Sequence, residues 1–113
     1  MTGPAHRVES KPFGCRVARA DGAVRITLEG ELDLATVAAV EAALRGPVDP
    51  SPERRVLDLR GLTFMDSTGL RTILSANGTA PREGWSLQIA GPPAVQRIFE
   101  ICGVAAGLRF VDP

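Results

Sequence analysis

The feature of this sequence that most constrains its fold is a regular alternation of helix-like and strand-like segments after residue 34. Segments with apolar residues at helical spacing are separated by short apolar runs that suit buried strands. Two strands joined by a helix are normally parallel, because a right-handed crossover returns the chain to the same end of the sheet. The predicted elements, in chain order, are a helix within residues 31–46, a strand within 54–62, a helix from 68 to 77, a strand at 85–90, a helix at 92–103 and a strand at 108–111.

The region before this alternation has the pattern of a β-hairpin. Residues 15–30, CRVARADGAVRITLEG, alternate apolar and polar side chains, and Asp21-Gly22 is a strong signal for a tight turn. We therefore expect two antiparallel strands, at about residues 14–19 and 23–30. The predicted fold class is α/β: an N-terminal β-hairpin joined to a mostly parallel, mixed sheet of about five strands with about three helices.

A single domain is expected to account for nearly the whole chain. A length of 113 residues is enough for one hydrophobic core and too short for two. Residues 1–12 are polar, contain two prolines and show no periodicity, so we expect a flexible N-terminal tail followed by a domain at residues 13–113. An isolated domain of this size with an average surface is expected to be monomeric.

Each predicted helix has an apolar face and recognisable ends. In the first helix Asp33 or Thr36 is expected to be the N-cap and Gly46-Pro47 the end, and the apolar face comprises Leu34, Val37, Ala38, Val40 and Leu44. The second helix has the apolar residues Leu70, Ile73 and Leu74 and is expected to end at Asn77-Gly78. The third starts with prolines and is expected to end at Gly103, with an apolar face of Val95, Ile98, Phe99 and Cys102.

The charge balance and composition exclude several classes of function. Thirteen basic and thirteen acidic side chains cancel, and the 4% of aromatic residues include no Tyr, so nucleic-acid binding is not indicated. No apolar run reaches the roughly 20 residues that span a bilayer, and the N-terminus has no hydrophobic signal core. We therefore expect a cytoplasmic protein without membrane contact, in which Cys15 and Cys102 are free, buried thiols.

The segment TFMDSTGLR, residues 63–71, is the candidate functional region. It lies at the predicted junction of a strand and a helix, which is where α/β proteins place functional residues. Asp66, Ser67 and Thr68 can each cap the helix, because a short side-chain oxygen accepts a hydrogen bond from the free amides there. One helix needs only one cap, so a second role stays open, either as a catalytic nucleophile or as a hydroxyl that is modified.

Catalysis is the weaker of these two interpretations. A serine nucleophile needs a base, and the only histidine, His6, lies in the predicted tail. The sequence has no G-x-S-x-G elbow, no phosphate-binding glycine loop and no His or Cys pair for a metal. We therefore predict a protein that is not an enzyme and that uses no metal or cofactor. Phosphorylation at the helix start would instead add about −1.5 to −2 charges beside Asp66 and, if the fold brings it close, Asp33.

Three segments of the chain resemble the bacterial anti-sigma factor antagonists, which carry the STAS domain named after sulfate transporters and these antagonists. The segments are GELD at 30–33, LDLRGLTFMDSTGLRTIL at 57–74 and PPAVQRIFEICGV at 92–104. The resemblance covers about residues 13–112, and the FMDSTGL block is its most specific part.

The resemblance implies a protein that switches partners in a stress response. Unphosphorylated members of this type bind an anti-sigma factor that is also an ATP-dependent serine/threonine kinase, and the sigma factor is thereby released for transcription. The kinase phosphorylates the hydroxyl residue after the motif Asp, here Ser67, and this phosphorylation ends binding. A metal-dependent serine/threonine phosphatase restores the binding form.

The resemblance also implies a set of partner-binding residues: Asp33, Asp66, Thr68, Gly69, Leu70 and Arg71. Gly69 is expected to let a partner approach the backbone closely. Leu70 either faces outward as an apolar contact for the kinase or belongs to the core. The alternative function is a non-switching STAS scaffold or accessory domain of a stress-signalling or membrane-transport complex, in which Ser67 only caps the helix.

Overall fold

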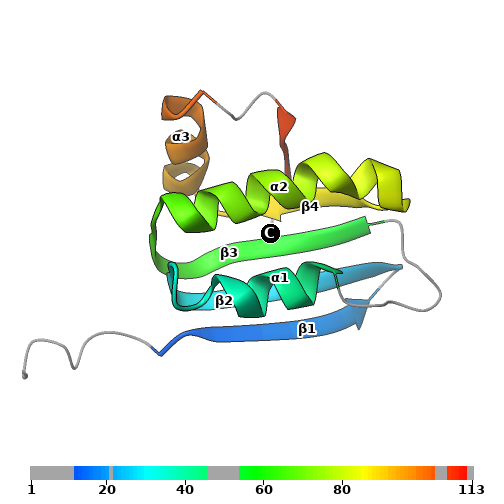
Figure 1. Cartoon of the computed structure of the whole chain (residues 1–113), viewed down its shortest axis with the longest axis horizontal. Helices are drawn as coiled ribbons and strands as arrows, with labels where there is room; N and C mark the ends of the chain where they lie inside the picture. The colour runs from blue at the N-terminus through cyan, green and yellow to red at the C-terminus, as the bar shows by residue number, and fades with distance from the viewer. Residues whose placement is uncertain (1–11, 21, 46–53, 104–106, 112–113) are drawn as a thin grey trace, which may run out of the picture.

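A computed structural model of the chain describes residues 12–20, 22–45, 54–103 and 107–111. Within these residues, five strands form one sheet and three helices connect them (Figure 1). The elements are β1 (Gly14–Ala20), β2 (Ala23–Leu32), α1 (Val37–Arg45), β3 (Arg54–Met65), α2 (Ser67–Glu83), β4 (Ser86–Ala90), α3 (Pro93–Ile101) and β5 (Arg109–Val111). The strands lie in their sequence order, with β1 antiparallel to β2 and every other pair parallel. The predicted fold class is confirmed, whereas residues 1–11 of the predicted tail lie outside the described residues.

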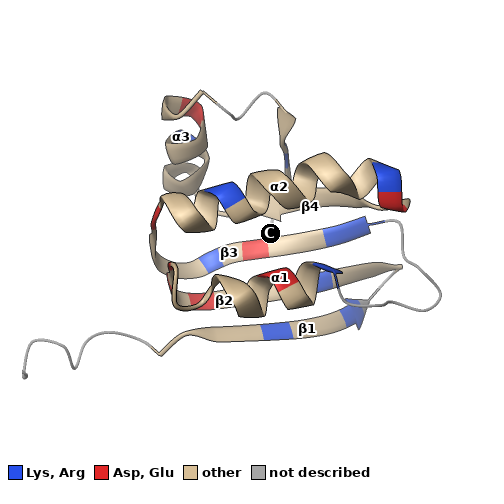
Figure 2. Cartoon of the chain, viewed as in Figure 1, with Lys and Arg blue, Asp and Glu red and all other residues tan. Residues whose placement is uncertain are grey.

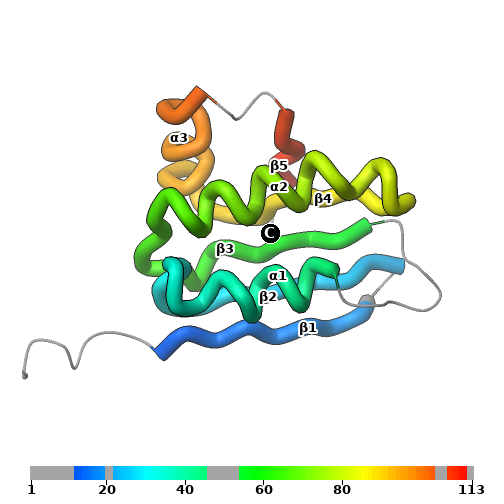
Figure 3. The backbone as a smooth tube through the Cα atoms, in the orientation of Figure 1, coloured from blue at the N-terminus to red at the C-terminus, as the bar shows by residue number. Residues whose placement is uncertain are grey.

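The helices follow from the strand order. Each parallel strand is added on the same side of the previous one, so right-handed crossovers bring all the connecting helices to one face of the sheet. Figures 1 and 3 show α1 and α2 lying over the strands on that face, with α3 beside one end of α2 and running across its direction. The opposite face of the sheet carries no helix within the described residues.

The core lies between the sheet and this helix layer. Along β2, buried residues alternate with half-buried ones, as the two-residue period of a strand requires. The helices contribute the fully buried side chains Val40, Ile73 and Phe99. Burying one such side chain contributes about 1.5–3 kcal/mol. Phe99 also anchors the last strand, because its ring lies 5.7 Å from that of Phe110 in a tilted arrangement.

Strand β3 is longer than the predicted strand at 54–62 and continues to Met65. Its pairing with β2 shifts by one residue between Thr27 and Glu29, which is a β-bulge, and shifts again between Gly30 and Glu31. The last paired residues are Leu32 and Met65. The two strands therefore end side by side, and Asp66, Ser67 and Thr68 follow directly after β3.

Helix α2 does not end at Asn77-Gly78, so that prediction was wrong. The helix continues to Glu83 and ends at Gly84, whose φ of 85° is the left-handed conformation typical of a glycine C-cap. Ala76 and Ala80 are buried against the sheet. This packing offsets the cost of Gly78, about 1 kcal/mol, and of the proline in the last turns.

The predicted apolar faces were wrong at four positions. Leu34 is 76% exposed because the helix begins only at Val37 and Leu34 lies in the turn before it. Ala38 and Ile98 are also exposed, since α1 and α3 each contact the core along a narrower stripe than their sequences suggest. Cys102, which follows the last residue of α3, is exposed as well. Cys15 is half-buried, and this burial raises the pKa of its thiol. Both cysteines are free, as predicted, but neither is fully buried.

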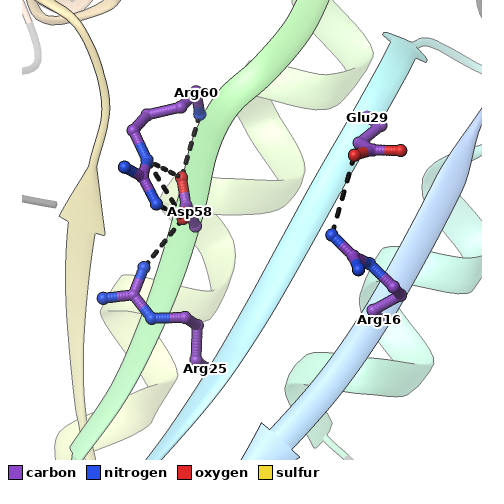
Figure 4. A network of polar contacts seen from close by, with 5 residues as sticks. All are labelled: Arg16, Arg25, Glu29, Asp58 and Arg60. Atoms are coloured by element: carbon purple, nitrogen blue, oxygen red, sulfur yellow. Dashed lines mark hydrogen bonds and ion pairs between the residues drawn. The ribbon is translucent and has the colours of Figure 1, made fainter.

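A buried carboxylate lies on the helix-free face of the sheet. The Asp58 side chain is 3% exposed and accepts hydrogen bonds from Arg25 at 2.8 Å and from Arg60 at 2.7 Å (Figure 4). Burial alone raises the pKa of Asp58, but the side-chain and backbone hydrogen bonds from Arg60 and the charges of Arg60 and Arg25 outweigh it. The pKa of Asp58 is therefore lower than its ordinary value.

The lowered pKa of Asp58 predicts an acid-dependent loss of stability. The ionised carboxylate stabilises the fold above the unfolded-state pKa of about 3.9, and this stabilisation is lost as the pH falls through the lower folded-state pKa. We expect the free energy of unfolding to decline below about pH 4, with a shallower decline in Asp58→Asn. Urea titrations of both proteins between about pH 7 and pH 2.5 measure this, and parallel acid profiles would contradict it.

Candidate functional site

The candidate site is the corner of the sheet at which β2 and β3 end. Leu32 and Met65 are paired, and the Asp66 amide donates a hydrogen bond to the Leu32 carbonyl at 3.1 Å. Asp33 and Asp66 each follow directly after one of these paired residues, so the fold brings the two acids to the same corner. Figure 2 shows acidic residues at this end of the two strands.

Asp66 is the N-cap of α2. Its Oδ1 accepts a hydrogen bond from the Gly69 amide at 3.0 Å, and its carbonyl accepts one from the Leu70 amide at 3.0 Å. Such a cap contributes about 1 kcal/mol. Of the three residues that the sequence offered as caps, the structure therefore selects Asp66 and leaves both hydroxyl residues without that role.

Ser67 is the first residue of α2 and is exposed. Within the described residues its hydroxyl makes no hydrogen bond. It lies at the positive end of a 17-residue helix, where the amides of Ser67 and Thr68 have no acceptor within the helix. An added phosphate would be attracted by this helix end and repelled by the two neighbouring carboxylates, so the modification would change the local charge strongly.

The Asp33 side of the corner is a turn held by hydrogen bonds. Asp33 Oδ1 accepts a hydrogen bond from the Ala35 amide at 3.0 Å, and the Thr36 hydroxyl accepts one from the Asp33 amide at 3.0 Å. The Thr36 hydroxyl also donates to the Glu31 carbonyl at 2.9 Å. Both residues predicted as caps of the first helix thus take part, and between them Leu34 points into solvent.

The remaining predicted site residues differ in accessibility. Arg71 is exposed and Thr68 is half-buried. Leu70 is half-buried and packs against the core, so it is intermediate between the two alternatives, an outward contact or a core residue, that the sequence left open. Gly69 is buried, and a Cβ there would lie 2.7 Å from Leu32 Cγ and 3.0 Å from Met65 Cγ. Because Gly69 has no side chain, α2 can pack closely on the strand ends. The sequence had suggested a different reason for a glycine here, namely the close approach of a partner to the backbone.

An apolar groove next to this corner was not expected from the sequence. The groove, about 230 Å³, lies between the end of β3 and helix α3 and is lined in part by Leu62, Phe64, Val95 and Ile98. Phe64 is 51% exposed and Ile98 44% exposed. Phe64 was missed because the predicted strand ended before it, and Ile98 because it was assigned to the core. For Ile98 the sequence does contain a signal, because α3 carries a further apolar residue, Ile101, outside its predicted apolar face.

Neither a metal site nor a membrane-spanning helix is found within the described residues. No three His, Cys, Asp or Glu side chains among them lie close enough to hold a metal ion. None of the helices in the described ranges is long and apolar enough to cross a membrane.

Comparisons with known proteins show which family the chain is similar to. The family model described as "Mlab, STAS domain" matches residues 15–111. The "Putative anti-sigma factor antagonist BtrV" of Bordetella bronchiseptica is 34% identical over 84 residues, which are 74% of this chain and 72% of BtrV. The anti-sigma-F factor antagonist RsfB of Mycobacterium tuberculosis is 34% identical over 61 residues, 54% of this chain and half of RsfB. The crystal structure of an anti-sigma factor antagonist from Mycobacterium paratuberculosis has a TM-score of 0.78 and 25% identity, with coverage of 92% of this chain and 91% of that one.

Proposed function

The chain belongs to the STAS domain family, and from this premise we propose that it is an anti-sigma factor antagonist controlled by phosphorylation of Ser67. In this proposal the unphosphorylated protein binds an anti-sigma factor that is also a serine/threonine kinase, which frees the sigma factor. Phosphorylation by that kinase ends binding, and a metal-dependent phosphatase reverses it. The protein acts in the cytoplasm through a domain at residues 13–113.

The observation that carries the proposal is the exposed hydroxyl of Ser67 next to a helix cap supplied by another residue. Because Asp66 already caps α2, Ser67 has no structural hydrogen bond to lose within the described residues. A kinase can reach the hydroxyl without unfolding the helix. The names of the relatives BtrV and RsfB support the assignment to antagonists of anti-sigma factors.

The proposed binding surface surrounds Ser67 on two sides. On one side are Asp33 and the exposed side chain of Leu34, and along α2 lies Arg71. On the other side the apolar groove at Phe64 and Ile98 adds surface that a partner can bury. Apolar residues beside charged ones are the usual composition of a specific protein interface, in which the apolar centre supplies most of the binding energy. Gly69 and Asp66 act indirectly by holding Ser67 in place.

The proposal is tested by mass spectrometry of the protein isolated from its own cells under resting and stressed conditions. We expect a fraction of the molecules to carry one phosphoryl group, with fragmentation locating it on Ser67, and this fraction to fall under stress. Protein that is unmodified at Ser67 under every condition would contradict the switch. It would favour the alternative of a non-switching scaffold, in which partner binding does not depend on phosphate.

A further inference from the structure

The face of the sheet opposite the helices, here called the open face, is uncovered within the described residues. Figure 4 shows it with the helices behind the strands and the side chains of Arg16, Arg25 and Arg60 in front. The side-chain alternation of β2 explains the placement, since Val24, Ile26 and Leu28 point into the core and the residues between them point away from it.

The open face presents cations above a buried anion. The Asp58 side chain is 3% exposed, whereas those of its partners Arg25 and Arg60 are 38% and 53% exposed. Arg16, 72% exposed, lies 3.6 Å from the Glu29 carboxylate, which is the exposed anion in this group at 43%. A partner would therefore meet the guanidinium groups and not the Asp58 carboxylate, although the whole chain has no net charge.

Asp58 fixes both guanidinium groups and leaves part of each one available. Arg25 donates from one terminal nitrogen, and Arg60 donates from Nε and Nη2. A guanidinium has five N–H donors in a rigid fork, so both groups retain donors that no described residue accepts from. Because their orientation is already set, less side-chain entropy is lost when a carboxylate binds them than with free arginines.

A groove continues this basic surface toward the far edge of the sheet. Arg60 lines it together with Pro92, Pro93, Gln96 and Phe110, and its volume is about 530 Å³. Its walls combine rigid apolar rings with the polar ends of Arg60 and Gln96. A groove lined in this way suits a narrow, extended chain with acidic side chains better than a flat surface of the same composition would.

We propose that the open face, with Arg25, Arg60 and this groove, docks an extended acidic segment of a partner protein. Charge complementarity selects the acidic chemistry. A protein is favoured over a lipid surface because the described large apolar side chains that are exposed lie elsewhere: Val17, Leu34, Phe64, Ile98 and Ile101. Stable binding to one side of a membrane combines electrostatic attraction with apolar side chains that insert between the headgroups. Since Ser67 lies at the start of a helix in the opposite layer, both surfaces can be occupied at once.

The proposal is tested by titrating the ¹⁵N-labelled protein with a hexaglutamate peptide and recording backbone and arginine Nε signals. We expect shifts in β2, in β3, in the residues that line the groove at the start of α3 and on β5, and in the Nε signals of Arg25 and Arg60. We also expect the affinity to fall at least about tenfold between roughly 50 and 300 mM salt, as for exposed charges. Shifts centred on the Ser67 corner, or no shifts at low salt, would overturn the proposal.

Two matched substitutions locate the binding. Arg60→Gln leaves Asp58 paired with Arg25 and is expected to weaken hexaglutamate binding about three- to tenfold, the loss of one exposed charge contact. Arg82→Gln removes an exposed arginine from the last turn of α2 and is expected to leave the affinity unchanged. Equal losses in both variants would show unspecific attraction and overturn the proposal.

Phosphatidylglycerol vesicles are the competing probe for a membrane surface. We expect the vesicles not to bind at the salt concentration at which the peptide binds. Vesicle binding that is abolished by Arg60→Gln would overturn the proposal and identify a membrane surface as the partner. None of these measurements depends on phosphorylation of Ser67. The variant Ser67→Asp is accordingly expected to bind the peptide like wild type. Failure here would therefore leave the proposed switch untouched, and failure of the switch would leave the open face untouched.

Discussion

Replacing Ser67 by aspartate is expected to weaken binding to the proposed partner, an anti-sigma kinase, by at least about 100-fold, or about 2.7 kcal/mol. The new carboxylate would join Asp33 and Asp66 at one corner, and a partner surface matched to a neutral hydroxyl would face a third negative charge. Juxtaposed charges of this kind cost several kcal/mol at an interface. Ser67→Ala, which removes only the hydroxyl, is expected to bind within about threefold of wild type and to resist phosphorylation.

The measurement is titration calorimetry of each variant with the purified kinase. Ser75→Asp is the matched control, because Ser75 is also exposed on α2 but lies two turns beyond the corner. It is expected to bind like wild type, so a general effect of added charge is distinguished from a local one. Wild-type affinity in Ser67→Asp, or equal losses at both positions, would argue against a charge switch at Ser67.

Phe99→Ala is expected to destabilise the fold by about 3–4 kcal/mol, the largest effect on stability that we predict. The ring is completely buried, and it connects α3 to the core and to Phe110 of β5. Removing it leaves a cavity that the surrounding residues can fill only in part, so the lost burial and the lost packing add together. Urea denaturation of the two proteins measures the difference.

Ile101→Ala provides the control within the same helix. Ile101 is 77% exposed, and its truncation is expected to change the free energy of unfolding by less than about 0.5 kcal/mol. A similar, small effect of both substitutions would mean that α3 is not anchored by Phe99.

The sequence predicted the architecture because the patterns that specify it are local. Alternation in β2, helical spacing around Val40 and Leu44, and the proline-started third helix each depend on neighbours within a few residues. The strand-to-helix junction at Asp66 was also visible, since a cap must stand where a strand ends and a helix begins.

The features that the sequence did not predict depend on contacts between distant residues. Helix α2 passes through Asn77 and Gly78 because Ala76 and Ala80 pack against the sheet, which outweighs the local helix-breaking tendency. Likewise, Gly69 is needed because Leu32, from another strand, occupies the space of a side chain. Whether Ile98 faces the core or solvent depends on the angle at which α3 docks, and the spacing of apolar residues does not determine that angle.

The hydrogen bond between the Asp66 amide and the Leu32 carbonyl has a consequence for the kinetics of the proposed switch. It ties the residue before the proposed phosphoacceptor to the sheet, so that adding phosphate need not wait for a segment to order or melt. Amide hydrogen exchange in α2 and the heat capacity of unfolding should then be nearly the same with and without phosphate. A cell using such a protein would respond as fast as its kinase and phosphatase turn over, with no lag from conformational relaxation.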